Sequence, residues 1–406
     1  MSDAGELRGF EIDAAQAWAG ARGHDVQFVR FRWPDLEADL RAGRFDVAMS
    51  GVTVRAERSA RSPMSVAVTR AEAGLYVRAP LPRPSRLSPE GRGLHVAVNR
   101  GGHLERLARA RLPEATLQLV SDNRALPDLL QRGAVDAIVA DGAEAASFPP
   151  GIVRARRLGS DRKAWWAAPG RPELVAQMNR WASSHEGRRR IARLRQRWGL
   201  PSPKPAGSVL SAAEDQVVDF VARRLALMPL VAEAKRAAST PPGAVAAVLA
   251  PAREAKIRQR ARTRARANGL EDDGFLALVE AQMATARRVQ ERVLATEVAG
   301  ASVFSLDGEL RPAIDVLDDE LARALAEAVP MTSGAPALRE ALAQETAGLA
   351  AAQPELAGLA QALAGVRPAV GCRRGCRAQA IRFSSGGRRR GISNPRVAPD
   401  QACALR

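Results

Sequence analysis

Positive charges and one amide recur at spacings that suit a small anion. Arg224 and Lys235 are eleven residues apart in RRLALMPLVAEAK, about three helical turns, so on one helix both side chains point to the same side. Arg253 in PAREAKI, Gln290 in AQMATARRVQERV and Arg311 in LRPAIDVL come from separate segments. Charges that converge from several helices predict a site that holds a small dianion in a folded shape.

The segment that contains these positions, from about 211 to 367, resembles the all-helical chorismate mutases, specifically the secreted class. The resemblance implies that Lys235 and Gln290 contact the ether oxygen of chorismate. It assigns carboxylate binding to Arg224, Arg253 and Arg311. Rearrangement to prephenate is pericyclic and needs no proton transfer, so catalysis means holding the reactive diaxial conformer and stabilising charge on the breaking ether bond.

Three further positions bear on this site. Arg287 lies three residues before Gln290 on the same expected helix, which places it at the rim of the pocket. Ala286 stands where these mutases usually have a polar residue, and Ala250 stands where an acid commonly precedes the arginine. The segment PPGAVAAV lengthens the loop after Lys235. These departures bear on rate and affinity more than on the identity of the site.

The first half of the chain has polar motifs after expected strands. In SGVTVRAER, Ser50 and Thr53 follow an apolar run, and Arg58 comes five residues after the threonine. In DGAEA, Asp141 ends the run VDAIVA and Glu144 follows it. Ligand contacts in open α/β sheets lie at the carboxyl ends of strands, so this motif is a candidate ligand site.

The motif NRGGHLE follows the expected strand LHVAVN and opens a helix. Free amides at a helix N-terminus, together with glycines that let the backbone approach, make Asn99, Gly101 and Gly102 a candidate anion site. His103 follows directly. It is either a hydrogen-bond donor to the ligand or an exposed side chain, and the sequence leaves both readings open.

These motifs resemble the two-lobed solute-binding fold of periplasmic amino-acid receptors and cyclohexadienyl dehydratase, an enzyme built on that fold. By resemblance Arg58 binds a substrate carboxylate in a two-pronged pair, to which Ser50, Thr53 and backbone amides add donors. Trp33 in RWPDL matches a tryptophan of the dehydratases and either flanks the substrate ring or belongs to the core. His103 stands where these proteins generally have threonine or serine.

Glu144 separates the enzyme from the receptors within this resemblance. Receptors keep an acid like Asp141 for the ligand's amino group, but they carry a small or apolar residue at the position of Glu144. A buried carboxyl has a raised pKa, so it can protonate the ring hydroxyl of prephenate, which leaves as water while carbon dioxide is lost. The alternative for Glu144 is an exposed helix residue.

We therefore expect a bifunctional enzyme of phenylalanine biosynthesis that converts chorismate into prephenate and prephenate into phenylpyruvate without metal or organic cofactor. The alternative is a binding domain that senses an amino or keto acid, fused to an active mutase. A third possibility is a degraded gene product with neither activity. The sequence leaves open whether arogenate is accepted beside prephenate and which homo-oligomer forms.

The charge of the chain does not require a nucleic-acid partner. The net charge is +17, and the tail from Pro368 contributes nine arginines against one acid, Asp400. No helix-turn-helix, zinc-finger or RNA-binding motif accompanies it, so we expect no specific nucleic-acid binding. The three cysteines and four histidines have no metal-ligand spacing. The sequence contains no apolar stretch of about 18 residues, so we expect no membrane-spanning helix.

The fold class predicted is multidomain, a two-lobed α/β domain followed by an all-α domain. Alternating apolar runs and helical segments indicate the first, and long helices without strand signals indicate the second. The expected boundaries are 1–198 for the α/β domain (lobe 1 about 1–88 and 170–198, lobe 2 about 89–169), 199–210 for a linker, 211–367 for the mutase domain and 368–406 for a tail.

Particular elements follow from the same patterns. The segment 172–198 and the segment 212–238 each predict one long helix, the second kinked by Pro229. Strands are expected at DVQFVRF, FDVAMS, GLYVRA, LHVAVN, TLQLVS and VDAIVA.

The sequence also leads to predictions about the first and last segments of the chain. The start MSDAGELRGF lacks the regions of a signal peptide, although both resembled families are usually exported to the periplasm. The first strand of the receptor fold is also expected to be missing, which would leave a neighbouring strand edge unpaired and the dehydratase weak or inactive. The tail, without apolar periodicity, is expected to be disordered or the product of a frame error.

Overall fold

The structure, a computed structural model, describes residues 7–31, 35–80, 88–204, 207–238, 251–295, 303–369 and 402–405. It divides into two compact units. One is formed by Gly9–Gly207 with Gln401–Arg406, and the other by Ser208–Asp400 with Met1–Arg8. The first unit is α/β and the second consists of helices, which confirms the predicted fold class.

The described strands of the first unit form one mixed sheet in the order β1-β8-β2-β7-β3-β6-β4-β5. Their bounds are β1 Phe28–Phe31, β2 Val47–Thr53, β3 Thr69–Arg78, β4 His95–Asn99, β5 Thr116–Val120, β6 Ala137–Asp141, β7 Ile152–Ala167 and β8 Ala402–Leu405. The apolar runs named above therefore become strands. Their inward side chains build separate cores around β2 and around β4 and β6.

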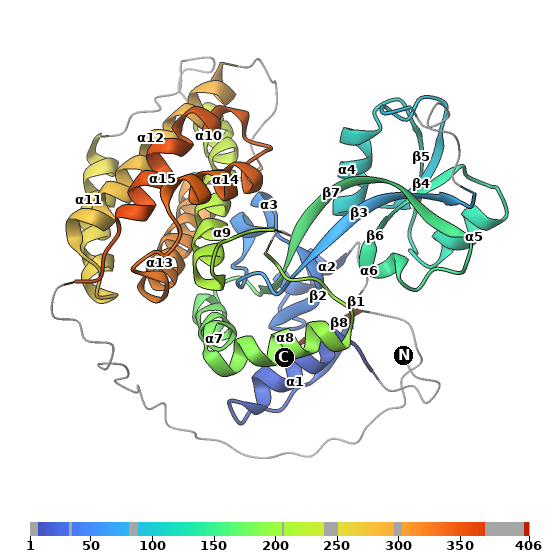
Figure 1. The fold of residues 1–406 in the computed structure, drawn as a ribbon, viewed down its shortest axis with the longest axis horizontal. Helices are drawn as coiled ribbons and strands as arrows, with labels where there is room; N and C mark the ends of the chain where they lie inside the picture. The colour runs from blue at the N-terminus through green and yellow to red at the C-terminus, as the bar shows by residue number, and fades with distance from the viewer. Residues whose placement is uncertain are drawn as a thin grey trace. The chain divides into compact units, whose positions relative to one another are not determined.

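The antiparallel pair β3 and β7 joins the two lobes of this unit. The two strands run side by side from the part that holds β2 into the part that holds β4, β5 and β6 (Figure 1). Their register runs from Thr69 opposite Lys163 to Arg78 opposite Ile152. The sequence patterns do not predict β7, which is 16 residues long. Its first half is rich in arginine and half-buried, so it lacks the apolar run that marks the other strands.

Helices connect and cover the strands. The described α-helices of this unit are α1 Phe10–Gly20, α2 Leu36–Arg41, α3 Ala56–Arg61, α4 His103–Arg111, α5 Ala125–Gln131, α6 Gly142–Ala145, α7 Pro172–Ser183 and α8 His185–Arg197. The single helix expected over 172–198 is wrong, because Ser184 has extended backbone angles and its side chain caps α8 at Gly187. A Cβ at Gly187 would lie 1.8 Å from the Trp181 carbonyl oxygen, so glycine lets the chain turn this closely.

Part of the tail contradicts the expectation of disorder. Residues Ala402–Leu405 form β8, which pairs antiparallel with both β1 and β2. The expected unpaired edge beside β2 is therefore wrong in the structure, since backbone groups of β8 supply the missing partners. The rest of the tail beyond residue 369 lies outside the described residues.

The second unit is helical throughout its described part. Its α-helices are α9 Ala212–Ala226, α10 Met228–Ala237, α11 Pro251–Ala267, α12 Asp272–Leu294, α13 Arg311–Ala328, α14 Ala335–Glu345 and α15 Leu356–Gly365, with short turns η3 Leu306–Leu310 and η4 Ala350–Glu355. The expected single helix over 212–238 is interrupted at Leu227. Pro229 lacks the N–H that a continuous helix would need and so occupies the first turn of α10.

Glu214 ties the start of α9 to the chain after α13. Its Oε1 accepts hydrogen bonds from the backbone N–H groups of Thr332 and Ser333, both at 2.7 Å, and its Oε2 accepts one from Ser211 N at 2.8 Å. Burial disfavours the charged carboxylate, but these donors outweigh it and lower its pKa to about 2. Such a satisfied buried carboxylate fixes the N-terminus of α9.

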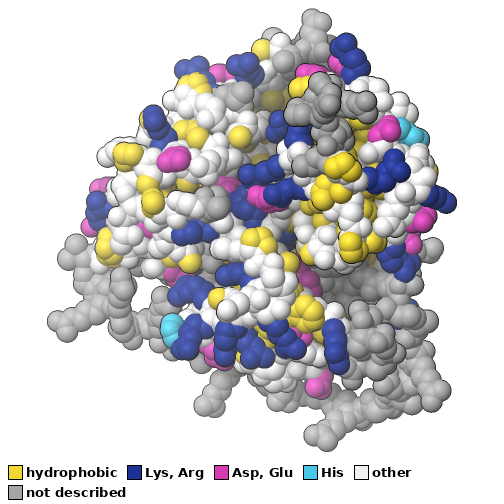
Figure 2. Space-filling model, turned by 45° about the vertical axis from the view of Figure 1, so that its right-hand side comes forward, with side chains coloured by type: hydrophobic (Ala, Val, Ile, Leu, Met, Phe, Trp, Pro, Cys, Tyr) yellow, Lys and Arg dark blue, Asp and Glu magenta, His cyan; other side chains and the backbone are white. Residues whose placement is uncertain are grey.

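The surface charges, the possibility of a membrane-spanning helix and the possibility of a metal site are considered next. Lys and Arg side chains recur among uncharged side chains over the face shown in Figure 2. Within the described ranges, no helix has the length and apolarity to cross a membrane. The described residues also contain no group of three or more His, Cys, Asp or Glu placed to hold a metal ion.

Candidate active sites

Lys163 lies at the centre of the polar cluster in the α/β unit. Its buried ammonium is 2.9 Å from Asp141 Oδ2, 3.1 Å from Asp161 Oδ2 and 3.1 Å from Thr53 Oγ1. Burial opposes the charge, but the Asp161 and Asp141 carboxylates outweigh it and raise the pKa of Lys163. Since an ammonium has three N–H donors, this lysine is fully paired.

Two arginines on and before α3 lie close to this cluster. Arg58 is buried, donates from Nη1 to the Thr53 carbonyl oxygen at 2.9 Å and lies 5.6 Å from the Trp166 ring centre. Burial and the charges of Arg55 and Arg106 lower its pKa to about 9. Arg55 has buried Nε and Nη1 atoms with no hydrogen-bond partner among the described residues. Guanidinium groups with unused donors are typical of sites that bind carboxylates, so these arginines are candidate ligands for an anion.

Glu144 lies at the carboxyl edge of the parallel strands β5, β4 and β6. Its Oε1 accepts a hydrogen bond from Asn123 Nδ2 at 2.5 Å, and its buried Oε2 has no partner among the described residues. Burial, and next the neighbouring Asp141, raise its pKa. Glu144 and Asn123 line a cavity of about 520 Å³ together with Phe148. The reading of Glu144 as an exposed helix residue is therefore wrong.

One backbone amide of the glycine motif at the start of α4 is already hydrogen-bonded to a side chain of this protein. Glu105 Oε2 accepts a hydrogen bond from Gly101 N at 2.6 Å, so that amide already has an anionic partner. Asn99 is buried at the end of β4, and Gly102 precedes the first residue of α4. The predicted anion site at these amides therefore stays a prediction, and a substrate anion would compete with Glu105 for the N–H of Gly101.

His103 and Arg106 on α4 reach residues of the other lobe and of the joining strand. His103 Nε2 is 3.5 Å from Asp161 Oδ2, and burial lowers the pKa of this imidazole. Arg106 pairs with Glu57 of α3 at 2.7 Å. The two lobes therefore meet across the polar cluster, and His103 points toward it.

The remaining residues near this cluster agree less well with the predictions from the sequence. Ser50 lies within β2, half-buried, and Trp33 lies outside the described residues. Glu11 was not predicted, yet its carboxylate accepts hydrogen bonds from Gly51 N and Trp165 Nε1, and burial raises its pKa. Sequence patterns also missed Arg55, Asn123, Asp161 and Lys163. If β7 had been predicted as a buried strand, Lys163 would have stood out as a charged side chain that points into the protein.

The helical unit brings the predicted cations into two neighbourhoods. Arg224 on α9 is buried and donates from Nε to Asp318 Oδ1 on α13 at 2.8 Å, while its buried Nη1 has no partner among the described residues. Asp318 is also 3.7 Å from Arg264 Nη1. Asp318 therefore holds Arg224 in place and leaves one donor for a ligand.

The second neighbourhood surrounds Glu254 on α11. Arg287 on α12 is 3.9 Å from the Glu254 carboxylate. Burial, and then the nearby charge of Arg311, lower the pKa of Lys235, whereas Glu254 acts in the opposite direction. Arg253 precedes Glu254 and is half-buried, and Arg311 forms an ion pair with Asp307. These cations come from α10, α11, α12 and the start of α13.

Gln290 is buried on α12, one turn beyond Arg287. Its Nε2 is 3.7 Å from the Met228 sulfur, and its Oε1 has no partner among the described residues. Ala286 lies on the same helix one turn earlier and is also buried. The amide is neutral at every pH. Its unpaired Oε1 is an acceptor, and only its Nε2, which lies beside Met228, is a donor to a ligand oxygen.

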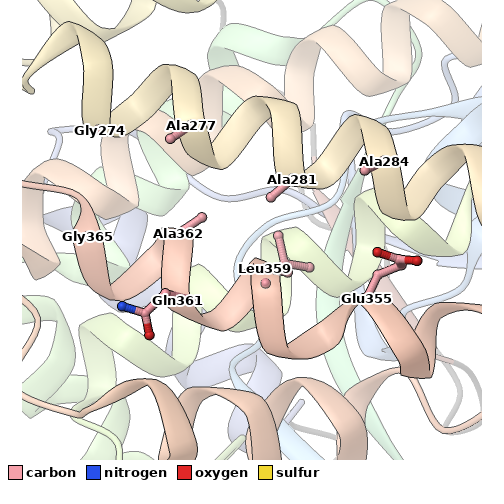
Figure 3. A pocket seen from close by; sticks show the side chains of 10 residues that line it. Gly274, Ala277, Ala281, Ala284, Glu355, Leu359, Gln361, Ala362 and Gly365 are labelled. Carbon is pink, nitrogen blue, oxygen red and sulfur yellow. The ribbon is translucent and has the colours of Figure 1, made fainter.

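A separate groove between α12 and α15 does not share this chemistry. Figure 3 shows Ala277, Ala281 and Ala284 facing Leu359 and Ala362 across a cavity of about 580 Å³. Its lining residues include one ionisable side chain, Glu355, and none of the predicted cations. Helix packing between small residues accounts for the groove.

Two families match the two units. Residues 1–201 match the bacterial extracellular solute-binding proteins, family 3. Residues 210–291 match chorismate mutase type II.

Curated relatives match the first unit. Cyclohexadienyl dehydratase of Pseudomonas aeruginosa is 30% identical over 154 residues, which cover 36% of this chain and 54% of that protein. The L-cystine-binding protein TcyJ of Escherichia coli K12 is 26% identical over 141 residues, which cover 35% of this chain and 53% of that protein. The chain thus spans about half the length of these relatives.

Solved structures similar to this chain also align with about half of it. The ancestral amino acid-binding protein AncCDT-1, a precursor of cyclohexadienyl dehydratase, is 26% identical with a TM-score of 0.45, covering 48% of this chain and 88% of that one. A putative transporter binding component from Wolinella succinogenes, complexed with lysine, is 22% identical with a TM-score of 0.44, covering 48% and 88%.

Proposed function

Because the chain joins a family 3 solute-binding domain to a chorismate mutase type II domain, we propose that it is a bifunctional enzyme that makes prephenate from chorismate and phenylpyruvate from prephenate. One observation supports the second activity above the others. Glu144 is half-buried with a raised pKa, its buried Oε2 has no partner among the described residues, and it lines a cavity at the carboxyl edge of the parallel strands β5, β4 and β6.

In the dehydratase step Glu144 protonates the ring hydroxyl of prephenate, and the C–O bond breaks to release water. The ring carboxylate leaves as carbon dioxide, and the electron pair of its C–C bond completes the aromatic ring. The remaining product is phenylpyruvate, so one proton enters and one water and one carbon dioxide leave. Arg58 and Arg55 bind the side-chain carboxylate through guanidinium N–H groups that the described protein leaves without a carboxylate partner.

In the mutase step no group transfers a proton. Arg224, Arg253 and Arg311 hold the two carboxylates so that the enolpyruvyl group lies over the ring. Lys235 and Gln290 donate to the ether oxygen, where negative charge grows as the bond breaks. The unpaired Arg224 Nη1 and the buried Gln290 support this assignment.

The test is a coupled assay of the whole chain. Chorismate is added, and prephenate and phenylpyruvate are followed together by ultraviolet absorbance. Accumulation of prephenate followed by phenylpyruvate is expected. Prephenate without phenylpyruvate would reject the dehydratase and leave the mutase.

The second candidate is a binding domain fused to an active mutase. The match to an L-cystine-binding protein favours it, since that relative binds a ligand by name. Saturable binding of prephenate without turnover would establish this alternative. The extracellular solute-binding family and the dehydratase relative together support a periplasmic location.

A further inference from the structure

The acids of the α/β domain's cleft already have a cation of their own. Lys163 Nζ lies within 3.1 Å of Asp141 and Asp161 and of the Thr53 hydroxyl. Asp141 Oδ1 also accepts from Ala143 N at 2.9 Å, and Asp161 Oδ2 accepts from Thr53 Oγ1 at 2.6 Å. Both carboxylates are therefore hydrogen-bonded within the protein, and they share the single positive charge of Lys163.

The other acids beside this cluster are engaged as well. Glu11 accepts hydrogen bonds from Gly51 N and Trp165 Nε1, and Glu57 pairs with Arg106. Glu144 keeps one oxygen without a partner among the described residues, but burial raises its pKa and so disfavours the charged carboxylate that an ammonium would need. A ligand's α-ammonium at this cluster would thus compete with Lys163 for Asp141 and Asp161.

The arginines near this cluster, in contrast, have N–H donors that no carboxylate of the described residues uses. Arg55 and Arg58 pair with no carboxylate of the described residues, and Arg55 keeps two buried N–H groups without partners. Lys163, Arg55 and Arg58 together outnumber the two carboxylates, Asp141 and Asp161, so an α-ammonium brought near them would add to an excess of positive charge. Like charges at such distances cost several kcal/mol when solvent is excluded.

We propose that Lys163 is the specificity-determining residue of this cleft: its ammonium fills the place of a ligand α-amino group, so the cleft takes 2-keto carboxylates and rejects the corresponding α-amino acids. The proposal rests on the proposed function of this domain and selects prephenate over arogenate. It assigns no proton transfer to Lys163.

Isothermal titration of the whole chain tests the proposal with phenylpyruvate and L-phenylalanine, which differ in the keto or amino group at one carbon. Phenylpyruvate should bind at least about tenfold more tightly. In Lys163→Met the ratio should fall toward one or invert, because Asp141 and Asp161 become available to an ammonium. Lys163→Arg should keep the preference.

The matched control is Arg157→Met, which removes an exposed cation of the same strand that pairs with Glu72. It should leave the ratio unchanged. If the wild-type protein binds L-phenylalanine as tightly as phenylpyruvate, or binds neither, the proposal is wrong whatever the variants do. A folded Lys163→Met with an unaltered ratio would also overturn it. The dehydratase assay measures turnover, whereas the titration measures binding. A protein that fails to turn over prephenate would therefore contradict the proposed function but not the preference for phenylpyruvate over L-phenylalanine.

Discussion

At the scale of single residues, chemistry in this chain depends on which polar atoms the fold buries without a partner. Glu144 Oε2, Arg224 Nη1 and Gln290 Oε1 are all buried and unpaired among the described residues. Burying such groups costs about 1–3 kcal/mol each, and a bound ligand that pairs with them recovers that cost. These atoms are therefore the most informative targets for substitution.

The first prediction concerns the proton donor. Glu144→Gln should lower dehydratase kcat by about 10²–10⁴-fold, because the amide keeps the size of the side chain but has no acidic proton. Chorismate turnover by the same protein should be unchanged. The control is Glu114→Gln, an exposed carboxylate of the same lobe that pairs with Arg92. A Glu144→Gln protein with more than about a tenth of the parent rate would rule out this role.

The second prediction concerns pH. Burial and then Arg311 lower the pKa of Lys235, so it is protonated at low pH and loses its proton, as pH rises, earlier than an ordinary lysine. Mutase kcat/KM should therefore fall on the alkaline side below the pKa of a free lysine, about 10.4. Lys235→Arg should move that fall to higher pH, whatever its absolute rate. An identical alkaline fall in both proteins would contradict the assignment.

Residue types predicted one part of these sites better than the other. Arg224, Lys235 and Gln290 lie in segments that the sequence predicts to be helical, but the break at Leu227 places Arg224 on α9 and Lys235 on α10 instead of on one helix. Arg55 and Lys163 could not be identified from the sequence, because an arginine in a turn and a lysine in an arginine-rich strand look like solvated side chains. Their roles arise from burial between lobes, which local sequence does not encode.

At the scale of elements, the apolar runs predicted the short strands and the long helices. The strand β7 and the helix α11 were missed for a shared reason. Both are rich in arginine, and α11 has only two alanines, Ala261 and Ala265, among its buried residues. Breaks in two expected long helices, at Ser184 and at Leu227, depend on a cap and on a proline whose exact effect the periodicity does not reveal.

The third prediction concerns the anchor of α9. The pKa of Glu214 is about 2, below the ordinary value of 4.5, so its stabilisation is fully present above pH 4.5 and is lost as pH falls toward 2. Glu214→Gln should destabilise the helical domain by about 1.5–3 kcal/mol at pH 7. The difference from the wild type should shrink between pH 4.5 and pH 2.

Denaturant unfolding can measure this effect separately for the helical domain. Tyr76 and every tryptophan precede residue 199, so fluorescence follows only the α/β domain. A transition seen by circular dichroism without a fluorescence change belongs to the helices. The matched control is Glu340→Gln on α14, whose side chain is exposed. Equal losses at pH 7 and at pH 2 would show that the carboxylate's charge is not the cause.

At the scale of the whole molecule, a strand distant in sequence completes the α/β domain. Among the described residues β1 pairs only with β8, and β8 also pairs with β2. No local pattern could predict this pairing, because the partners are more than 350 residues apart. The register places Ala404 opposite Val29 and Ala48.

The fourth prediction tests this strand. Ala404→Pro removes a backbone N–H from a strand with neighbours on both sides, so it should lower the fluorescence-detected Tm by more than about 4 °C. Ala404→Ser keeps that N–H and should have little effect. The helical transition and mutase activity should be the same in both variants. Equal Tm values for the proline and serine variants would exclude β8 from the folded sheet.

The Nε and Nη1 atoms of Arg55, which have no partner among the described residues, also bear on how this protein has to be handled. Guanidinium donors that bind a carboxylate, as proposed for Arg55, do not distinguish it sharply from sulfate, citrate or phosphate, each of which offers several oxygen acceptors to the same donors. Such buffer anions would compete with the substrate and raise its apparent KM. Assays and titrations of the α/β domain therefore belong in buffers whose anions are monovalent and weakly hydrogen-bonding.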